Sequence, residues 1–359
     1  MTAVLNAIGL MSGTSMDGIE AALLRTDGMD SLEVGPHVGY PYPTDLRQRL
    51  LSLRLDSIEA GTLEEDVTNV HEEAVRHLCK ARKIDLATVD LIGFHGQTIF
   101  HDPAAGLTRQ LGDGQRLANA LGRPVVNAFR QNDMLHGGQG APFAPAYHWA
   151  LVRSTGIVGP VAVLNIGGVS NVTLVHGDEL YACDCGPGNA LIDDWVRDKY
   201  QVPFDDGGRI AATGQIDACA LQALLGNPYF EQRGPKSLDR NAFSVGPVSA
   251  LSARDGAATL TAFTAAAIAI EATRLPRAPD QWIVVGGGRH NDRLFLSLQE
   301  RLGAPVKRAE AFGWMGNAIE AQAFAYLAVR SVRNLPLSWP STTGVREPVS
   351  GGMHWMPRQ

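Results

Sequence analysis

Apolar runs separated by glycine-rich turns occur at two distant places in the chain. Val4–Met11 is apolar, and Ile19–Leu24 follows it after a polar turn. Val161–Ile166 and the alternating segment Val169–Val175 repeat this arrangement around a Gly-Gly turn. Two short apolar runs joined by such a turn are typical of a β-hairpin. We therefore expect two hairpins and interpret their similarity as an internal repeat.

Between and after the hairpins the hydrophobic spacing alternates between strand-like and helix-like. The segments with helical character are Leu63–Arg82, Asn189–Tyr200, Asp217–Leu225, Ala257–Leu275 and Gly316–Arg333. The short strand-like segments are Leu91–Phe94, Leu180–Cys183 and Trp282–Val285. This alternation predicts an α/β fold. His71 is expected on a solvated helix face.

Composition narrows the possible classes of protein. The chain has 359 residues, 45% hydrophobic and 19% charged, which suits one large or two medium globular domains. A net charge of −6 with scattered basic residues argues against a nucleic-acid partner. Four cysteines are too few for a disulfide scaffold, and Cys183 and Cys185 lack a second pair for zinc. Neither a signal peptide nor a membrane-spanning run is apparent, so we expect a cytoplasmic protein without a membrane partner.

The first turn combines glycine, hydroxyl and carboxylate groups. Gly13 and Gly18 allow the backbone to approach an anion, and Thr14 and Ser15 add donors. Asp17 would repel a phosphate, so its natural role is to hold Mg²⁺ or its water. An ordinary hairpin turn also favours Gly and Asp, and this alternative stays open.

Two further glycine turns follow apolar strands. Asn165-Ile166-Gly167-Gly168-Val169-Ser170 has the chemistry of the first turn without a carboxylate. Gly286-Gly287-Gly288 permits a flat ligand such as adenosine to come close, although a flexible strand-to-helix loop is the alternative. Neither a P-loop nor a Rossmann fingerprint is present.

Several polar residues are candidates for substrate chemistry. Asp184 follows a predicted strand and precedes a glycine-rich turn, which suits a general base, with a helix N-cap or turn as the alternative. His95 and Gln97 end another strand and offer donors and acceptors for sugar hydroxyls. Arg130 could bind a carboxylate on a ligand, or form an interdomain salt bridge with Asp133.

Seven motifs in order together resemble the anhydro-N-acetylmuramic acid kinase family. They are GLMSGTSMDG, GFHGQTIFHDP, FRQNDMLHGGQGAPFAP, LNIGGVSN, DCGPGN, RGPKS and VVGGG, and the resemblance runs from Ile8 to about Ala328. It implies a two-lobed actin-like ATPase fold, a ribonuclease H-like unit that is duplicated. Lobe one would be residues 1–128 with a helix at about 320–333, lobe two 129–319, and 334–359 an irregular C-terminal segment.

The resemblance also implies a reaction. Members use ATP with Mg²⁺ to open 1,6-anhydro-N-acetylmuramic acid with water and phosphorylate O6, giving N-acetylmuramic acid 6-phosphate and ADP in peptidoglycan recycling, and they are homodimers. The implied catalytic base is Asp184. The implied nucleotide-binding residues are Gly13, Thr14, Ser15, Asp17, Gly18, Asn165, Gly167, Gly168, Ser170, Gly286, Gly287 and Gly288, and the implied substrate residues are His95, Gln97, Arg130, Asp133 and Glu320.

Some positions depart from the family pattern. Ala128 stands where an Asp is common, and His136 is unusual. These departures concern the fine contacts to the substrate and not the class of reaction. Because a fold alone does not fix a function, two alternatives stay open, a kinase of the same fold for another sugar and a non-enzymatic, ATP-switched binding module.

Overall fold

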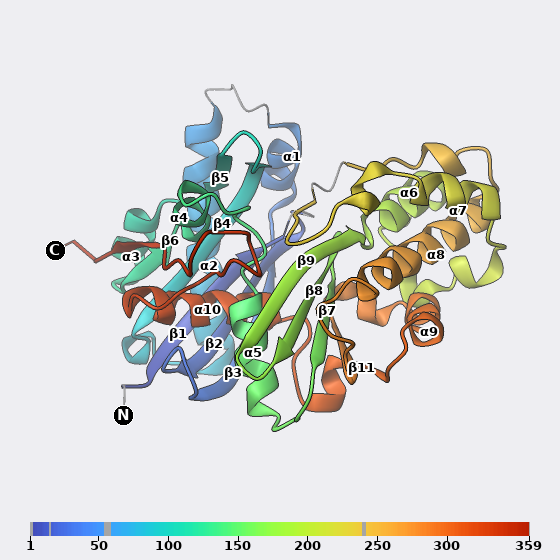
Figure 1. Cartoon of the computed structure of the whole chain (residues 1–359). Coiled ribbons are helices and arrows are strands. Elements are labelled where there is room, and N and C mark those ends of the chain that lie inside the picture. The colour runs from blue at the N-terminus through green and yellow to red at the C-terminus, as the bar shows by residue number, and fades with distance from the viewer. Residues whose placement is uncertain (1–2, 14–15, 54–58, 239–241, 359) are drawn as a thin grey trace. The chain divides into compact units, whose positions relative to one another are not determined.

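The hairpin β1 (Leu5–Ser12) and β2 (Gly18–Thr26) lies in a mixed sheet that organises the first part of the chain. The computed structural model describes residues 3–13, 16–53, 59–238 and 242–358. The chain divides into unit 1, Met1–Gly156 with Ala318–Gln359, and unit 2, Ile157–Asn317 (Figure 1).

The observed unit boundaries differ from those expected at two places. Residues 129–156 were expected in the second lobe and 334–359 as a separate tail, whereas both belong to unit 1. Residues 129–156 belong to unit 1 because α5 (Pro145–Ser154) packs against α10 (Ile319–Val332). Residues 334–359 belong to it because they contain β12 (Met353–Trp355), which pairs with β6.

Among the described residues, the strand order in the unit 1 sheet is β12–β6–β4–β1–β2–β3, and β5 also pairs with β4. The parallel neighbours are β1, β4 and β6, and the other pairings are antiparallel. The remaining strands are β3 (Leu32–Pro41), β4 (Leu91–Asp102), β5 (Leu107–Leu111) and β6 (Val125–Asn127). The remaining helices are α1 (Thr44–Ser52), α2 (Glu59–Arg82), α3 (Gly114–Leu121) and α4 (Phe129–Leu135).

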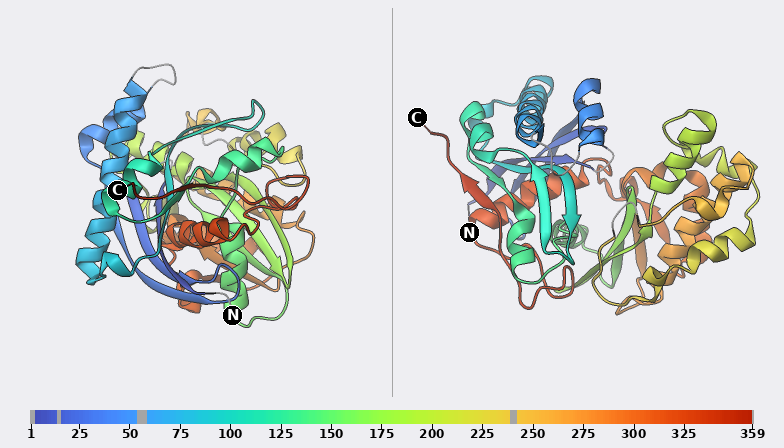
Figure 2. Two further views of the ribbon diagram at one scale, coloured as in Figure 1. Left: turned by 90° about the vertical axis from the view of Figure 1, so that its left-hand side faces the viewer. Right: turned by 90° about the horizontal axis from the view of Figure 1, so that it is seen from above.

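The two faces of this sheet are covered by different helices. Ile8 and Leu10 alternate with Gly9 along β1 and pack in a hydrophobic core with Leu63 of α2. On the other face Gly9 lies beside Gly93 of β4, and a side chain at either glycine would collide with the backbone of α10. Figure 2 shows α2 (blue) and α10 (red) on opposite sides of the sheet. The two glycines therefore allow α10 to approach closely.

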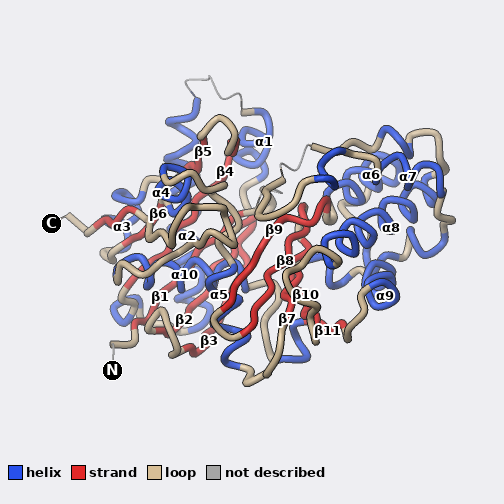
Figure 3. The backbone as a smooth tube through the Cα atoms, viewed as in Figure 1, coloured by secondary structure: helices blue, strands red, loops and turns tan. Residues whose placement is uncertain are grey.

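Unit 2 repeats the strand topology of unit 1. Its strand order is β11–β10–β7–β8–β9, with β7, β8 and β9 antiparallel and β7, β10 and β11 parallel (Figure 3). The order β6–β4–β1–β2–β3 in unit 1 has the same succession of two parallel and then two antiparallel pairings. The expected internal repeat is thus confirmed as a duplicated fold. The strands are β7 (Val161–Ile166), β8 (Val169–His176), β9 (Glu179–Pro187), β10 (Gln281–Val285) and β11 (Val306–Arg308).

Helix α8 (Ala253–Ala272) is the central helix of unit 2. It contacts α6 (Ala190–Tyr200), α7 (Ala218–Leu225), α9 (Asp292–Arg301) and β9, and its Ala- and Thr-rich sequence is buried over most of its length. A helix that is apolar on most sides is expected to be buried in this way. No helix in the described ranges has the length and apolar character needed to span a membrane.

Three expectations need correction. Asp184 lies within β9 and not at its end, because the strand continues to Pro187. His71 was expected to be solvated, but its ring is fully buried, with Nδ1 2.7 Å from the Val67 carbonyl oxygen. The irregular C-terminal segment includes β12, because an edge position on β6 was open to it.

Candidate active site

The turn between β1 and β2 is fixed at its start by Gln97 of β4. Ser12 Oγ donates to Gln97 Oε1 at 2.5 Å, and Gln97 Nε2 donates to the carbonyl oxygens of Gly13 (3.2 Å) and Thr98 (3.1 Å). The Gln97 side chain is fully buried. Its amide is thus engaged with the turn, where the sequence had indicated a sugar contact. The expected donors Thr14 and Ser15 lie outside the described residues.

The other end of the turn is held by β3 and α1. Met16 has a left-handed φ of 52°, and its carbonyl accepts from Arg47 Nε at 2.9 Å. The Asp17 carbonyl accepts from the Tyr42 N–H at 3.2 Å, and a Cβ at Gly18 would lie 2.7 Å from the Tyr40 carbonyl oxygen. The backbone around Asp17 is therefore tightly constrained. Such constraint suits a loop that presents backbone groups to an anion.

A connected polar network in unit 1 contains three expected substrate residues. Arg130 donates from Nη2 and Nε to His95 Nε2 at 2.9 and 3.2 Å, and from Nη1 to the Gly140 carbonyl at 2.6 Å. The Gly140 N–H donates to Asp133 Oδ2 at 2.7 Å, and Thr343 Oγ1 donates to Asp133 Oδ1 at 2.6 Å. The structure thus brings His95, Arg130 and Asp133 together, and Thr343 of the C-terminal segment joins them.

His95 is neutral in this network. Burial, followed by the charge of Arg130, holds the pKa of His95 well below its usual value. Its Nε2 accepts from Arg130, so Nδ1 carries the proton and donates to the Gly96 carbonyl at 2.8 Å. Glu320 lies in the first turn of α10 and is half-buried. Arg130 is thus the cation of this network, and Asp133 is its carboxylate.

In unit 2 the second and third glycine turns lie side by side. Val285 at the end of β10 is in parallel register with Asn165 of β7. Gly286 has a φ of 76°, and a Cβ there would lie 2.7 Å from the Ile166 carbonyl oxygen. Only glycine fits this position, because both the backbone conformation and the available space exclude a side chain.

The Gly167-Gly168 turn also meets the start of α6. The N–H groups of Gly188 and Ala190 donate to the Gly168 carbonyl at 2.9 and 3.2 Å, and the N–H of Asn189 donates to the Gly167 carbonyl at 2.8 Å. Ser170 Oγ donates to the Gly186 carbonyl at 3.0 Å. Ser170 therefore supports the turn through its hydroxyl.

Asp184 lies on β9, opposite Asn171 of β8. The residue is 7% exposed, and its Oδ2 accepts from the Leu238 N–H at 2.7 Å. The N–H of Asp184 donates to the Lys236 carbonyl at 2.9 Å. The N-cap of α6 is Asn189, so the alternative of a capping role for Asp184 is excluded.

Two buried cations were missed in the sequence. Arg289 donates from Nη1 to the Gly286 carbonyl at 2.7 Å and from Nε to Glu310 Oε1 at 2.8 Å, so it supports the third glycine turn. Lys236 forms an ion pair of 3.0 Å with Glu271, and both side chains are buried. The motif RGPKS was the available signal for Lys236, but a buried partner 35 positions away cannot be recognised from spacing.

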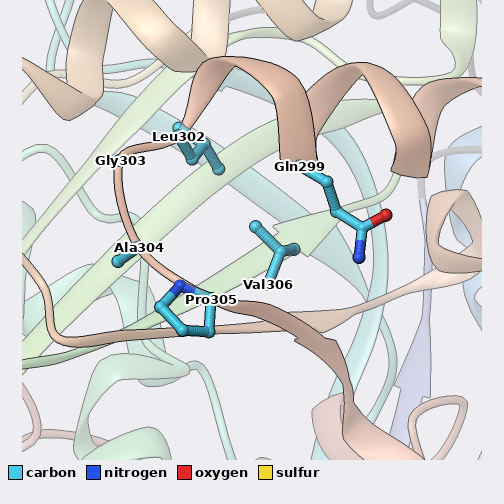
Figure 4. Close-up of a pocket in the computed structure, with 6 residues that line it drawn as sticks. All are labelled: Gln299, Leu302, Gly303, Ala304, Pro305 and Val306. Carbon is cyan, nitrogen blue, oxygen red and sulfur yellow. The ribbon is translucent and has the colours of Figure 1, made fainter.

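A surface hollow elsewhere in unit 2 lacks such chemistry. It lies between α9 and β11 and is lined by Gln299, Leu302, Gly303, Ala304, Pro305 and Val306 (Figure 4). None of these residues is ionisable. In the described ranges, no three His, Cys, Asp or Glu side chains are grouped so as to bind a metal ion.

Comparisons with known proteins bear on the family of the chain. The anhydro-N-acetylmuramic acid kinase family profile matches residues 5–357. The anhydro-N-acetylmuramic acid kinase of Rhodospirillum rubrum is 51% identical over 356 residues, which cover 97% of this chain and 94% of that protein. That of Methylobacterium nodulans is 49% identical over 370 residues, covering 97% and 99%.

A solved structure shares the fold at low sequence identity. Component A of the (R)-2-hydroxyglutaryl-CoA dehydratase of Acidaminococcus fermentans aligns with a TM-score of 0.51 and 12% identity, over 92% of this chain and 99% of that one. This likeness concerns the fold alone, and it agrees with the expected duplicated actin-like architecture. By its sequence over nearly its whole length, the chain belongs to the anhydro-N-acetylmuramic acid kinase family.

Proposed function

We propose that this chain opens 1,6-anhydro-N-acetylmuramic acid with water and transfers the γ-phosphoryl group of ATP to O6. The products are N-acetylmuramic acid 6-phosphate and ADP, as peptidoglycan recycling in the cytoplasm requires. The observation that carries the proposal is family membership over residues 5–357, combined with a buried carboxylate, Asp184, on the strand that pairs with β8 just after the second glycine turn.

Asp184 acts as the general base. It takes a proton from water as the water oxygen forms a bond to C1 of the sugar. The C1–O6 bond breaks, O6 forms a bond to the γ-phosphorus, and ADP leaves. Because O6 is captured by phosphorus, no carboxylic acid is needed to protonate it, unlike in a glycosidase that uses two carboxyl groups.

The glycine turns bind the nucleotide. The backbone around Gly13 and Gly18 and around Gly167 and Gly168 receives the phosphates, and Gly286–Gly288 receives the adenosine. Backbone N–H groups that are already fixed cost little reorganisation when charge develops on the phosphate.

The residues present fit a Mg²⁺ ion that arrives with ATP. Mg²⁺ commonly uses one or two carboxylates together with substrate phosphates and water, and Asp17 supplies a carboxylate at the first turn. When bound, the ion neutralises charge on the transferred phosphoryl group. We place His95, Arg130, Asp133 and Glu320 on the sugar side, and Gln97 as the support of the first turn. We further propose that the active form is a homodimer.

Isotope labelling tests the reaction. In ¹⁸O-labelled water, mass spectrometry should locate the label at C1 of the sugar and leave the phosphate unlabelled. Ring opening should require ATP. Label in the phosphate, or opening of the ring without ATP, would refute the coupled mechanism. A panel of other sugars, followed by ADP release, tests the alternative substrate.

A further inference from the structure

Three hydrogen bonds to Asp184 come from one irregular segment, residues 229–238. Tyr229 donates its hydroxyl to the Asp184 carbonyl at 2.8 Å, the Asp184 N–H donates to the Lys236 carbonyl at 2.9 Å, and the Leu238 N–H donates to Asp184 Oδ2 at 2.7 Å. Figure 1 shows this yellow segment passing along the end of β9 after α7. The segment therefore helps to fix both the backbone position and the carboxylate direction of Asp184.

The segment is fixed to α8 by Lys236. Lys236 Nζ lies 3.0 Å from Glu271 Oε2, donates to the Gln232 carbonyl at 3.2 Å, and lies 4.4 Å from the centroid of the Tyr229 ring. The side chains of Lys236 and Glu271 are only 5% and 1% exposed. The pair is thus almost completely removed from water.

Glu271 also contacts the strand that carries Asp184. Its Oε1 accepts from Cys183 Sγ at 3.4 Å, and Cys183 directly precedes Asp184 in β9. A more distant contact, 3.7 Å, joins Oε2 to Arg274, which is partly exposed. One carboxylate therefore connects α8, β9 and the irregular segment.

An ion pair in this position is costly if its only purpose is stability. Burying two charges carries a desolvation penalty that apolar residues of similar size would avoid. The advantage of the ion pair is precise orientation, because an ion pair with further hydrogen bonds fixes the positions of both groups more tightly than apolar contacts do. Catalysis needs that accuracy, since a displacement of about 1 Å can cost roughly 100-fold in rate.

We propose that the Lys236–Glu271 ion pair is a positioning element for Asp184. By fixing the 229–238 segment between α8 and β9, it holds the Asp184 carboxylate in the direction required to activate water. Lys236 and Glu271 act through Asp184 and do not themselves contact the reacting atoms. This inference rests on the proposed role of Asp184 as the base.

The test uses the double variant Lys236→Met/Glu271→Gln in the full chain. Replacing both residues avoids leaving one buried charge unpaired, which would be strongly destabilising. We expect kcat to fall roughly 10- to 100-fold, in keeping with a displaced base. The KM values for ATP and the sugar should stay within about threefold, because the glycine turns and the sugar-side residues are unchanged. Lys236→Arg, which keeps the charge, should recover most of kcat.

Lys199 provides a matched control. Its Nζ lies 2.9 Å from Asp198 and 5.0 Å from the Trp195 ring centroid, but it is 37% exposed on α6. Lys199→Met therefore removes the same kinds of contact away from Asp184, and it should leave kcat unchanged.

The outcomes separate this inference from the proposed function. A wild-type kcat in the double variant, or parallel losses of kcat and ATP affinity, would overturn the positioning role. If the wild-type chain fails to open the anhydro sugar, the proposed reaction is wrong. Amide hydrogen exchange then decides the inference separately: faster exchange of the Asp184 amide in the double variant supports the coupling, and unchanged exchange refutes it.

Discussion

The third glycine turn offers a sharp test, because two adjacent glycines differ in what a methyl group would meet. At Gly286 the backbone φ is 76°, and an added Cβ would lie 2.7 Å from the Ile166 carbonyl oxygen. At Gly287 the nearest atom is Asn189 Nδ2 at 3.9 Å, an ordinary contact. Gly286→Ala and Gly287→Ala each add one methyl group, but only the methyl group at position 286 would overlap neighbouring atoms.

The expected cost of Gly286→Ala has two parts. At Gly286 the backbone has φ 76° and ψ 174°, a region essentially restricted to glycine, and holding a residue with a Cβ there costs about 1–3 kcal/mol. Relieving the overlap with the Ile166 carbonyl adds about 1–3 kcal/mol, as is usual for overpacking. The sum of about 2–6 kcal/mol should lower the Tm of a unit of this size by roughly 4–24 °C. Gly287→Ala should change the free energy of unfolding by less than about 1 kcal/mol. The added methyl group meets only an ordinary contact, and alanine also lowers the conformational entropy of the unfolded chain.

Thermal unfolding without nucleotide, followed by circular dichroism, measures these differences. Titration calorimetry with ATP then separates folding from binding. Gly287→Ala should weaken ATP binding in a stable protein if the methyl group faces the adenosine. A Tm for Gly286→Ala within about 1 °C of the wild type would refute the steric reasoning. Normal ATP affinity in Gly287→Ala would argue against adenosine contact at that residue.

Three other substitutions and a pH series extend these tests. Asp184→Asn should reduce kcat by about 100-fold or more while ATP still binds. The asparagine amide keeps an acceptor for the Leu238 N–H but loses the basicity of the carboxylate. A variant with a tenth of the wild-type rate would exclude the base role. Ala128→Asn should raise the free energy of unfolding in urea by roughly 0.5–1 kcal/mol, because Ala128 has a left-handed φ of 52° that asparagine tolerates better; no gain would contradict this. Burial lowers the pKa of His71 to about 4, so its contribution to stability is present above the ordinary value of 6.5 and is lost as pH falls from 6.5 towards 4. Urea unfolding across that range should lose about 1.4 kcal/mol per pH unit from this group, and His71→Phe should flatten the dependence; an equal slope in both proteins would refute the assignment.

The hydrophobic pattern alone predicts much of the secondary structure. The two hairpins are confirmed because a glycine turn between two apolar runs determines a local pairing that needs no distant partner. The repeat between them indicates the duplication that the strand orders of both sheets confirm. The ordered motifs identify the family, and the family profile and the relatives confirm that identification.

The tertiary structure decides which residues support the candidate site. Gln97 is engaged with Ser12 and Gly13 because β1 and β4, 85 residues apart at this contact, are neighbours in the sheet. The contacts between Lys236 and Glu271 and between Thr343 and Asp133 join segments whose spacing has no periodic signature. Local patterns report propensity and amphipathicity, which depend on near neighbours in the sequence. The partner of a buried charge instead depends on which distant segments fold against it, so it appears only once the chain is folded.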